Sequence, residues 1–259
     1  MTGSKQTGMV LQDRDRHLLS ELGTMRVIDR EMAKQAAGFG STTRANVRLL
    51  QLVRSGLLRR FFVGSVGAGR KSVYTLSAKG GEQVSARLPG IKRAAGRLIV
   101  GDRFVEHQFG VNQVYLALKY APAPTPDIRL LRWRGFREPI SEAIKLTPDA
   151  YFELEASKTA RPMFLEVDLG TEGLTVWQQK TGYYLQLAIS GQFQKLFHQP
   201  QFRVLVVAAT ERRLRNLRQT IAKQTDKIFW FTNIESINRC GLFAPIWLRP
   251  KGDQPATLL

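Results

Sequence analysis

Three carboxylates in the second half of the chain have the residue types and spacing of a cation site. Asp149 follows Pro148 at the start of one predicted strand, and residues 164–168 predict a second strand in which Glu166 and Asp168 alternate onto one face. If the two strands pair, the three side chains converge. Like charges repel in a partly desolvated site, so we expect Asp149, Glu166 and Asp168 to bind Mg²⁺ or Mn²⁺.

A helix is predicted downstream of these strands. Its apolar stripe at helical spacing comprises Leu174, Trp177, Thr181, Leu185 and Ala188. Lys180 lies beside the stripe, close enough to reach the strand ends, where an ammonium group could counter charge that builds on a phosphate. In the alternative interpretation, Asp149 caps a turn, and Glu166 and Asp168 pair with basic residues such as Arg132 or Arg134.

The chain is strongly basic. It carries 39 Lys and Arg residues against 21 Asp and Glu residues, a formal net charge of +18. Residues 1–100 hold 18 of these basic and 6 of these acidic side chains, so the N-terminal part carries most of the excess. Such a balance favours a polyanionic partner.

Chain length and the position of helix-breaking residues favour two domains. The 259 residues are 43% hydrophobic, which is enough apolar material for two ordinary cores. Pro and Gly interrupt any helix near residues 88–96, so we expect domains at 8–96 and 97–250.

Other classes of site and location are disfavoured. Cys240 is the only cysteine, which excludes an internal disulfide, and the three histidines are too scattered for a zinc-finger spacing. The N-terminus lacks the apolar stretch of a secretory signal, and no later run approaches the roughly 18 apolar residues that span a bilayer. We therefore expect a cytoplasmic protein with no membrane partner.

The first domain is predicted to be a winged helix-turn-helix. Helices are expected at residues 13–22, from a cap at Asp29 through Ala36, and between Ser41 and Gly56. Residues 57–63 and 72–76 predict a hairpin whose basic tip, residues 64–71, would be the wing. We expect the third helix to bury Val47, Leu50 and Val53.

Basic and amide side chains on these elements predict a double-stranded DNA interface. The third helix would present Arg44, Arg48 and Gln51 to a major groove. The wing would place Arg59, Arg60, Arg70 and Lys71 on phosphates or in a minor groove. The alternative is a solvated basic surface on three helices that merely pack together.

The second domain alternates helices and strands. Strands are expected at residues 128–133, 149–154, 163–168, 202–208 and 228–231, with helices at 102–120, around Lys180, and at 211–223. The order helix, three strands, helix, strand is that of a restriction-endonuclease-like core, in which a mixed sheet lies between helices. The predicted fold class of the whole chain is therefore α+β.

At these residues the chain resembles a known superfamily and a narrower family. Pro148-Asp149 is similar to the first motif of the PD-(D/E)xK nucleases, although Asp168 stands where the motif has lysine, and Lys180 is the candidate migrated replacement. The Gln179–Tyr183 segment also resembles the Gln-x-x-x-Tyr helix of some branches of that superfamily. Together with the winged helix, residues 10–235 resemble the replication-relaxation family of bacterial mobile elements and the mobilisation relaxases related to restriction endonucleases.

The resemblance implies action on plasmid or integrative-element DNA at an origin, with replication or mobilisation proteins as partners. One hypothesis is metal-dependent nicking by Asp149, Glu166, Asp168 and Lys180. In a variant of this mechanism, the hydroxyl group of Tyr183 or Tyr184 attacks phosphorus. Packing in the core is nevertheless the better interpretation of both tyrosines. The other hypothesis is a non-enzymatic DNA-binding regulator that keeps the nuclease fold as a scaffold for a homodimer or a protein partner. The absent motif lysine favours the second hypothesis.

Overall fold

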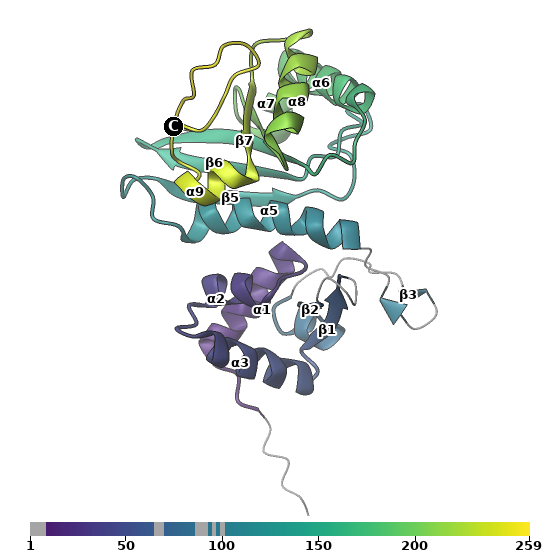
Figure 1. Cartoon of the computed structure of the whole chain (residues 1–259), viewed down its shortest axis with the longest axis vertical. Helices are drawn as coiled ribbons and strands as arrows, with labels where there is room; N and C mark the ends of the chain where they lie inside the picture. The colour runs from purple at the N-terminus through teal and green to yellow at the C-terminus, as the bar shows by residue number, and fades with distance from the viewer. Residues whose placement is uncertain (1–8, 65–69, 86–92, 95–96, 99–101) are drawn as a thin grey trace, which may run out of the picture. The chain divides into compact units, whose positions relative to one another are not determined.

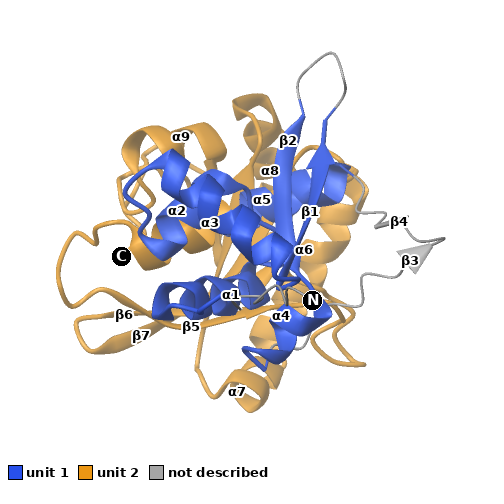
Figure 2. Ribbon diagram, turned by 90° about the horizontal axis from the view of Figure 1, so that it is seen from below, with its two compact units in different colours: residues 1–112 blue, residues 113–259 orange. Residues whose placement is uncertain are grey.

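The computed structural model describes residues 9–64, 70–85, 93–94, 97–98 and 102–259. The chain forms two compact units, residues 1–112 and 113–259 (Figure 2), so the division falls inside helix α5 (Asp102–Tyr120). The predicted connection at 88–96 lies outside the described residues, apart from strand β3 (Arg93–Ala94), which pairs with β4 (Arg97–Leu98). The fold class is α+β, as predicted: a winged helix, then a mixed sheet with helices.

The first unit has the predicted order of three helices and a hairpin. Its elements are α1 (Asp13–Met25), α2 (Arg30–Ala37), α3 (Thr42–Arg54), β1 (Leu58–Val63), β2 (Lys71–Leu76), the short α4 (Ala78–Glu82) and the first part of α5. Strands β1 and β2 pair antiparallel, with Arg60 opposite Tyr74. Residues 65–69 of the predicted wing tip lie outside the described residues.

Side-chain caps fix where the helices of this unit begin. The Asp29 carboxylate accepts a hydrogen bond from the Met32 amide at 2.8 Å, and the Ser41 hydroxyl accepts one from the Arg44 amide at 3.2 Å. Gly38 ends α2 in the left-handed conformation, with φ 62°. The chain therefore turns within a few residues between α2 and α3, as a helix-turn-helix requires.

The buried stripe of α3 differs from the prediction. Ala45, Leu49 and Leu52 enter the core, whereas the side chain of Val47 is 52% exposed. The sequence holds two overlapping apolar stripes in this helix, and packing against α2 and β1, its main neighbours, buries the second. The α3 face that points to solvent is therefore rotated relative to the predicted one.

The second unit is built on a five-stranded mixed sheet. Its strands are β5 (Arg129–Gly135), β6 (Ala150–Ala156), β7 (Thr159–Asp168), β8 (Arg203–Ala208) and β9 (Phe229–Asn233), in the order β5-β6-β7-β8-β9. The first three run antiparallel to one another, and β7, β8 and β9 run parallel. The helices that follow α5 are α6 (Leu174–Ile189), α7 (Gln192–Phe197), α8 (Glu211–Ala222) and α9 (Ile234–Cys240).

The main core of this unit lies on the sheet face that α6, α7 and α8 cover (Figure 1). Phe164 is at its centre, with ring centroids 5.5 Å from Tyr184 and 5.1 Å from Phe202. On the opposite face, the second half of α5 packs on β5, where the Tyr115 and Trp133 rings are 4.9 Å apart. Because strand residues alternate between faces, Glu166 and Asp168 point toward the helices α6 and α8.

Helix α6 also rotates relative to the prediction. Trp177 and Thr181 are buried as expected, but Tyr184 and Leu187 complete the stripe, while Leu174 and Ala188 are exposed. Sequence patterning also did not predict the short helices α4, α7 and α9. Within the described residues, no helix is long and apolar enough to cross a membrane.

Candidate functional site

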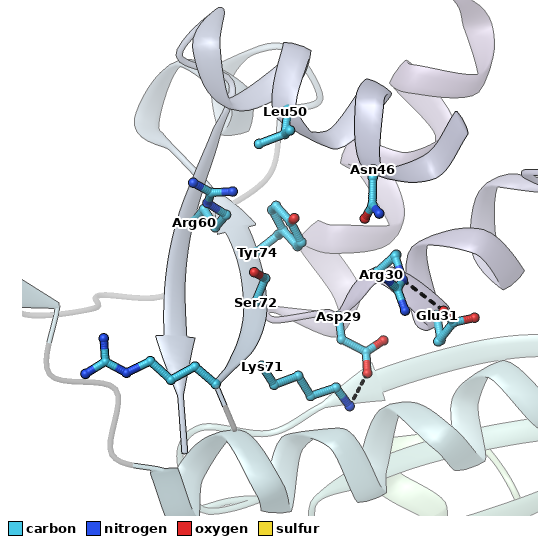
Figure 3. Close-up of a pocket in the computed structure, with 10 residues that line it drawn as sticks. Asp29, Arg30, Glu31, Asn46, Leu50, Arg60, Lys71, Ser72 and Tyr74 are labelled. Carbon is cyan, nitrogen blue, oxygen red and sulfur yellow. Dashed lines mark hydrogen bonds and ion pairs between the residues drawn. The ribbon is translucent and has the colours of Figure 1, made fainter. Parts of the chain in front are cut away.

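A groove of about 450 Å³ lies between α3 and the β1–β2 hairpin, and we call it the hairpin groove (Figure 3). Asn46 and Leu50 line it from α3, facing Arg60, Ser72 and Tyr74 on the hairpin. The hairpin residues share one face because Arg60 lies opposite Tyr74, and Ser72 is two residues from Tyr74 along β2. The groove is therefore bounded by the two elements that a winged helix uses on DNA.

Acidic groups at the groove are already neutralised. The buried Asp29 forms an ion pair with Lys71, and Arg30 Nε is 3.0 Å from the Glu31 carboxylate. The Lys71 ammonium also lies 4.8 Å from the centroid of the Phe109 ring. Lys71, a predicted wing contact, thus holds the base of β2 to α2 and α5 within the first unit.

The other predicted wing residues carry charge that carboxylates do not neutralise. Arg60 and Arg70 are exposed and form no ion pair with a carboxylate in the described part of the chain. The Arg60 guanidinium stacks 5.2 Å above the ring of Phe62, which is 52% exposed. Arg59 is half-buried and projects from the other face of the hairpin, opposite Thr75.

The three predicted contacts of α3 differ in their surroundings. Arg44 and Gln51 are exposed. Arg48 instead reaches the fully buried Asp15 of α1, with Nε 2.8 Å from Oδ1, and donates to the Gln51 side chain at 2.9 Å. Burial alone would raise the pKa of Asp15, but the bond and charge of Arg48 hold it below its ordinary value. Arg48 therefore ties α3 to α1.

In the second unit, Asp149 and Glu166 occupy neighbouring strands. Asp149 directly precedes β6, where its amide donates to the Leu165 carbonyl at 3.2 Å and its carboxylate accepts from the Val167 amide at 2.7 Å. These two bonds flank Glu166 on β7. The Asp149 charge adds to the effect of burial in raising the pKa of the Glu166 carboxyl group.

Glu166 is buried and has two polar partners from α6. Its Oε2 lies 3.0 Å from Lys180 Nζ, and its Oε1 accepts a hydrogen bond from the Tyr184 hydroxyl at 2.7 Å. Burial first, and then Asp149, raise the pKa of Glu166 to about 7, although Lys180 and Tyr184 favour the carboxylate. Glu166 is thus poised to titrate near neutral pH.

Lys180 bridges two carboxylates. Besides Glu166, its ammonium group contacts Glu172 at 2.8 Å. Burial alone would lower the pKa of Lys180, but the charges of Glu166 and Glu172 raise it well above the usual range. The folded protein therefore favours the charged form of Lys180. As expected from the sequence, this lysine lies beside the end of β7 that carries Glu166.

Asp168 has different surroundings, although it lies only two residues from Glu166. Arg213 of α8 contacts both oxygens, at 2.7 and 2.8 Å, and the Trp177 indole and Gly170 amide each donate at 2.6 Å. Burial opposes ionisation of Asp168, but these donors hold its pKa below the ordinary value. The predicted convergence of three carboxylates is therefore not seen, because Arg213 engages Asp168.

The remaining arrangement is two carboxylates beside one lysine. Within the residues described, no group of three or more His, Cys, Asp or Glu side chains is placed to hold a metal ion. Asp149 and Glu166 are carboxylate donors of the kind that Mg²⁺ takes in proteins, one or two at a time together with substrate phosphates. Burial is the largest cause of the raised pKa of Glu166, and the Lys180 ammonium already lies against that carboxyl group.

Sequence patterning missed several partners of these residues, namely Asp15, Glu172, Tyr184 and Arg213. The signal for Arg213 was available: β7 and β8 run parallel, so the helix after β8 begins at the sheet edge where Asp168 ends β7. Tyr184 is fully buried and its hydroxyl donates to Glu166, an environment that raises the pKa of Tyr184 well above its ordinary value. Tyr183 is half-buried and accepts from Gln179 at 3.3 Å.

The fold defines an α+β protein in which a winged helix precedes a mixed five-stranded sheet with helices. The model of the replication-relaxation family matches residues 19–199, and the chain belongs to that family. Membership indicates a role in the replication or mobilisation of mobile elements. No curated protein and no solved structure matches the chain.

Proposed function

We propose that this protein binds double-stranded DNA at the origin of its mobile element and nicks one strand there by metal-dependent hydrolysis. The observation that carries the cleavage proposal is the 3.0 Å contact between Lys180 and Glu166, beside Asp149. Two carboxylates and a lysine, the chemical set of a PD-(D/E)xK site, are gathered although the lysine comes from a helix rather than from the strand.

Binding is proposed to rest on the first unit. Arg44, Gln51, Arg60 and Arg70 lie exposed on α3 and the hairpin, on either side of the hairpin groove. In a winged helix, the helix enters the major groove and the hairpin contacts the adjoining backbone, so the groove between them would take one phosphate strand. The net charge of +18 supports this polyanionic partner.

Cleavage is proposed to use the residues of the second unit in distinct roles. Asp149 and Glu166 would hold Mg²⁺ or Mn²⁺, which would supply a polarised phosphate and a bound water of lowered pKa. Lys180, kept charged by Glu166 and Glu172, would stabilise the negative charge that develops on phosphorus. Asp168 would position α6 and α8 through Trp177 and Arg213 rather than touch the substrate.

A second candidate function is a non-catalytic accessory factor or transcriptional regulator. The observation that favours it is the saturation of the site: both oxygens of Asp168 are bound by Arg213, and Lys180 is held by two carboxylates. Such a unit would serve as a scaffold for a second copy of the chain or for a replication or mobilisation protein.

Glu166→Gln separates the two candidates, with Glu142→Gln as a matched control because Glu142 is an exposed acid in the same unit. Each protein is incubated with supercoiled origin DNA and Mg²⁺ or Mn²⁺, and nicks are counted on denaturing gels while affinity is measured separately. We expect Glu166→Gln to bind origin DNA normally and to leave it intact, and Glu142→Gln to nick like the wild type. Normal binding without nicking by the wild type would instead establish the accessory role.

A further inference from the structure

Two arginines stack on Trp230 and a third, Arg161, lies beside one of them, Arg203, at the end of the sheet where β7 and β8 begin. The guanidinium groups of Arg203 and Arg249 lie 4.7 and 4.8 Å from the Trp230 ring centroid. Arg161 projects from the same sheet face as Arg203, because Arg203 pairs with Met163, two residues along β7. Glu166 lies further along β7 and points to the opposite face, so this arginine cluster is separate from the nuclease-like site.

Acidic groups balance the arginine cluster only in part, since the Asp226 carboxylate acts on Arg249. In the described part of the chain, none of the three forms an ion pair with a carboxylate: Arg203 donates to the Leu258 carbonyl at 2.6 Å and Arg249 to the Asp226 carbonyl at 3.1 Å. Burial first, and then the charges of Arg161 and Arg249, lower the pKa of Arg203. Positive charge is thus concentrated there at a cost that a bound anion would relieve.

A pocket adjoins these charges. It has a volume of about 290 Å³ and is lined by Arg161, Arg203, Gln199 and Gln201 among other residues. Arginine forks and glutamine amides are donors that match phosphate oxygens, and stacking on an indole holds a guanidinium in place before a ligand arrives. The pocket therefore combines concavity, fixed donors and positive charge that acidic groups balance only in part.

We propose that the arginine cluster of Arg161, Arg203 and Arg249 holds a phosphodiester group of DNA against the second unit, apart from the winged helix. This inference rests on the proposed function, because it takes the ligand to be the same DNA. The cluster adds a second backbone contact that is independent of base sequence. Arg203 also holds the C-terminal segment through Leu258, so the exposed Arg161 and the half-buried Arg249 are the residues to alter.

The test measures the affinity of the full chain for a fluorescent origin duplex by anisotropy over a series of KCl concentrations. Arg161→Gln and the double variant with Arg249→Gln are compared with Arg215→Gln, which removes an exposed arginine from α8 on the other side of the sheet. Each lost phosphate contact should make the slope of log affinity against log salt concentration shallower by about 0.9. Near 0.1 M salt this corresponds to an affinity about eightfold weaker. Thermal melting checks that each variant folds.

We expect the slope to decrease by about one unit in Arg161→Gln, further in the double variant, and little in Arg215→Gln. Equal slopes in the double variant and Arg215→Gln, with tight binding by the wild type, would overturn this inference alone. No DNA binding by the wild type would overturn it together with the proposed function. Inorganic phosphate is also added at constant ionic strength. If it raises the melting temperature of the wild type but not of Arg161→Gln, and the salt slopes for DNA are equal in these two proteins, the site takes free phosphate and the assignment to DNA fails.

Discussion

Two acidic residues on one strand have opposite electrostatic surroundings. Asp168 receives four hydrogen bonds, from Arg213, Trp177 and Gly170, and its pKa is lowered. Glu166, two residues earlier, is buried near another carboxylate, and its pKa is raised to about 7. The first arrangement stabilises a permanent charge, whereas the second leaves a group whose charge depends on pH. The difference separates a structural acid from a candidate reactive one.

Removing Arg213 should destabilise the second unit. Arg213→Ala leaves Asp168 buried without its main cationic partner, which typically costs about 3–5 kcal/mol. Because the folded-state pKa of Asp168 is lowered, the wild type should hold this stability above pH 4 or so and lose it as pH falls through the folded-state pKa. Denaturant melts of both proteins from pH 3 to 7 measure the difference, with the exposed Arg212→Ala as control. If the two proteins differ in free energy of unfolding by the same amount at every pH from 3 to 7, the pairing of Arg213 with ionised Asp168 is contradicted.

The pH dependence of nicking should follow Glu166. With a pKa of about 7, the carboxylate needed for the cation is mostly protonated at pH 6, so the nicking rate should fall about tenfold for each unit below 7. Metal binding favours the deprotonated acid, so raising the Mn²⁺ concentration should shift the midpoint to lower pH. The burial that raises this pKa favours the neutral acid, so its contribution to folding stability is present at low pH and is lost as pH rises through 7. A flat rate profile between pH 6 and 8 would argue against Glu166 as the titrating group.

Within α3, neighbouring basic residues serve different purposes. Arg48 is fixed to the buried Asp15, whereas Arg44 lies exposed near the start of the helix. This pairing joins α3 to α1 and is compatible only with the observed rotation of α3, in which Ala45, Leu49 and Leu52 are buried. The exposed face that remains, with Arg44, Val47 and Gln51, is the one available to a major groove.

Substituting these two arginines should give separable effects. Arg48→Ala leaves the buried Asp15 carboxylate without its cationic partner and should lower the stability of the first unit by about 3–5 kcal/mol. Arg44→Ala should leave the melting temperature unchanged and weaken binding to origin DNA by about 1–3 kcal/mol if Arg44 reads a base edge, or less if it contacts phosphate. Thermal melts and anisotropy titrations of both variants provide the comparison. An equal loss of stability in the two variants would contradict the division of roles.

Sequence patterning predicted most elements but not their rotations. Caps such as Asp29 and Ser41, and the order of helices and strands, are local signals and were confirmed. The stripe predicted for α3 was wrong, since none of Val47, Leu50 and Val53 is buried, and the stripe predicted for α6 was only partly right. Partners distant in sequence decide which apolar side chains turn inward. The same limit applies to the site: alternation placed Glu166 and Asp168 on one face, but only the packing of α6 and α8 assigns each its cation.

At the scale of the whole molecule, basic charge is distributed over both units. The exposed arginines of α3 and the hairpin belong to the first unit, while the arginine cluster around Trp230 belongs to the second. The proposed cleavage residues lie in the second unit, on the sheet face opposite that cluster. In the proposed function, the first unit would recognise the origin, and the second would supply backbone contacts and the nicking chemistry.

The most direct test is the dependence of nicking on metal in the wild type and in Asp149→Asn. Supercoiled origin DNA is incubated with each protein over a range of Mg²⁺ and Mn²⁺ concentrations, and conversion to the open-circular form is measured. We expect nicking by the wild type that saturates with metal, and little or none by Asp149→Asn, which should still bind the DNA. Equal nicking by both proteins, or none by the wild type at any metal concentration, would contradict metal-dependent cleavage at Asp149 and Glu166.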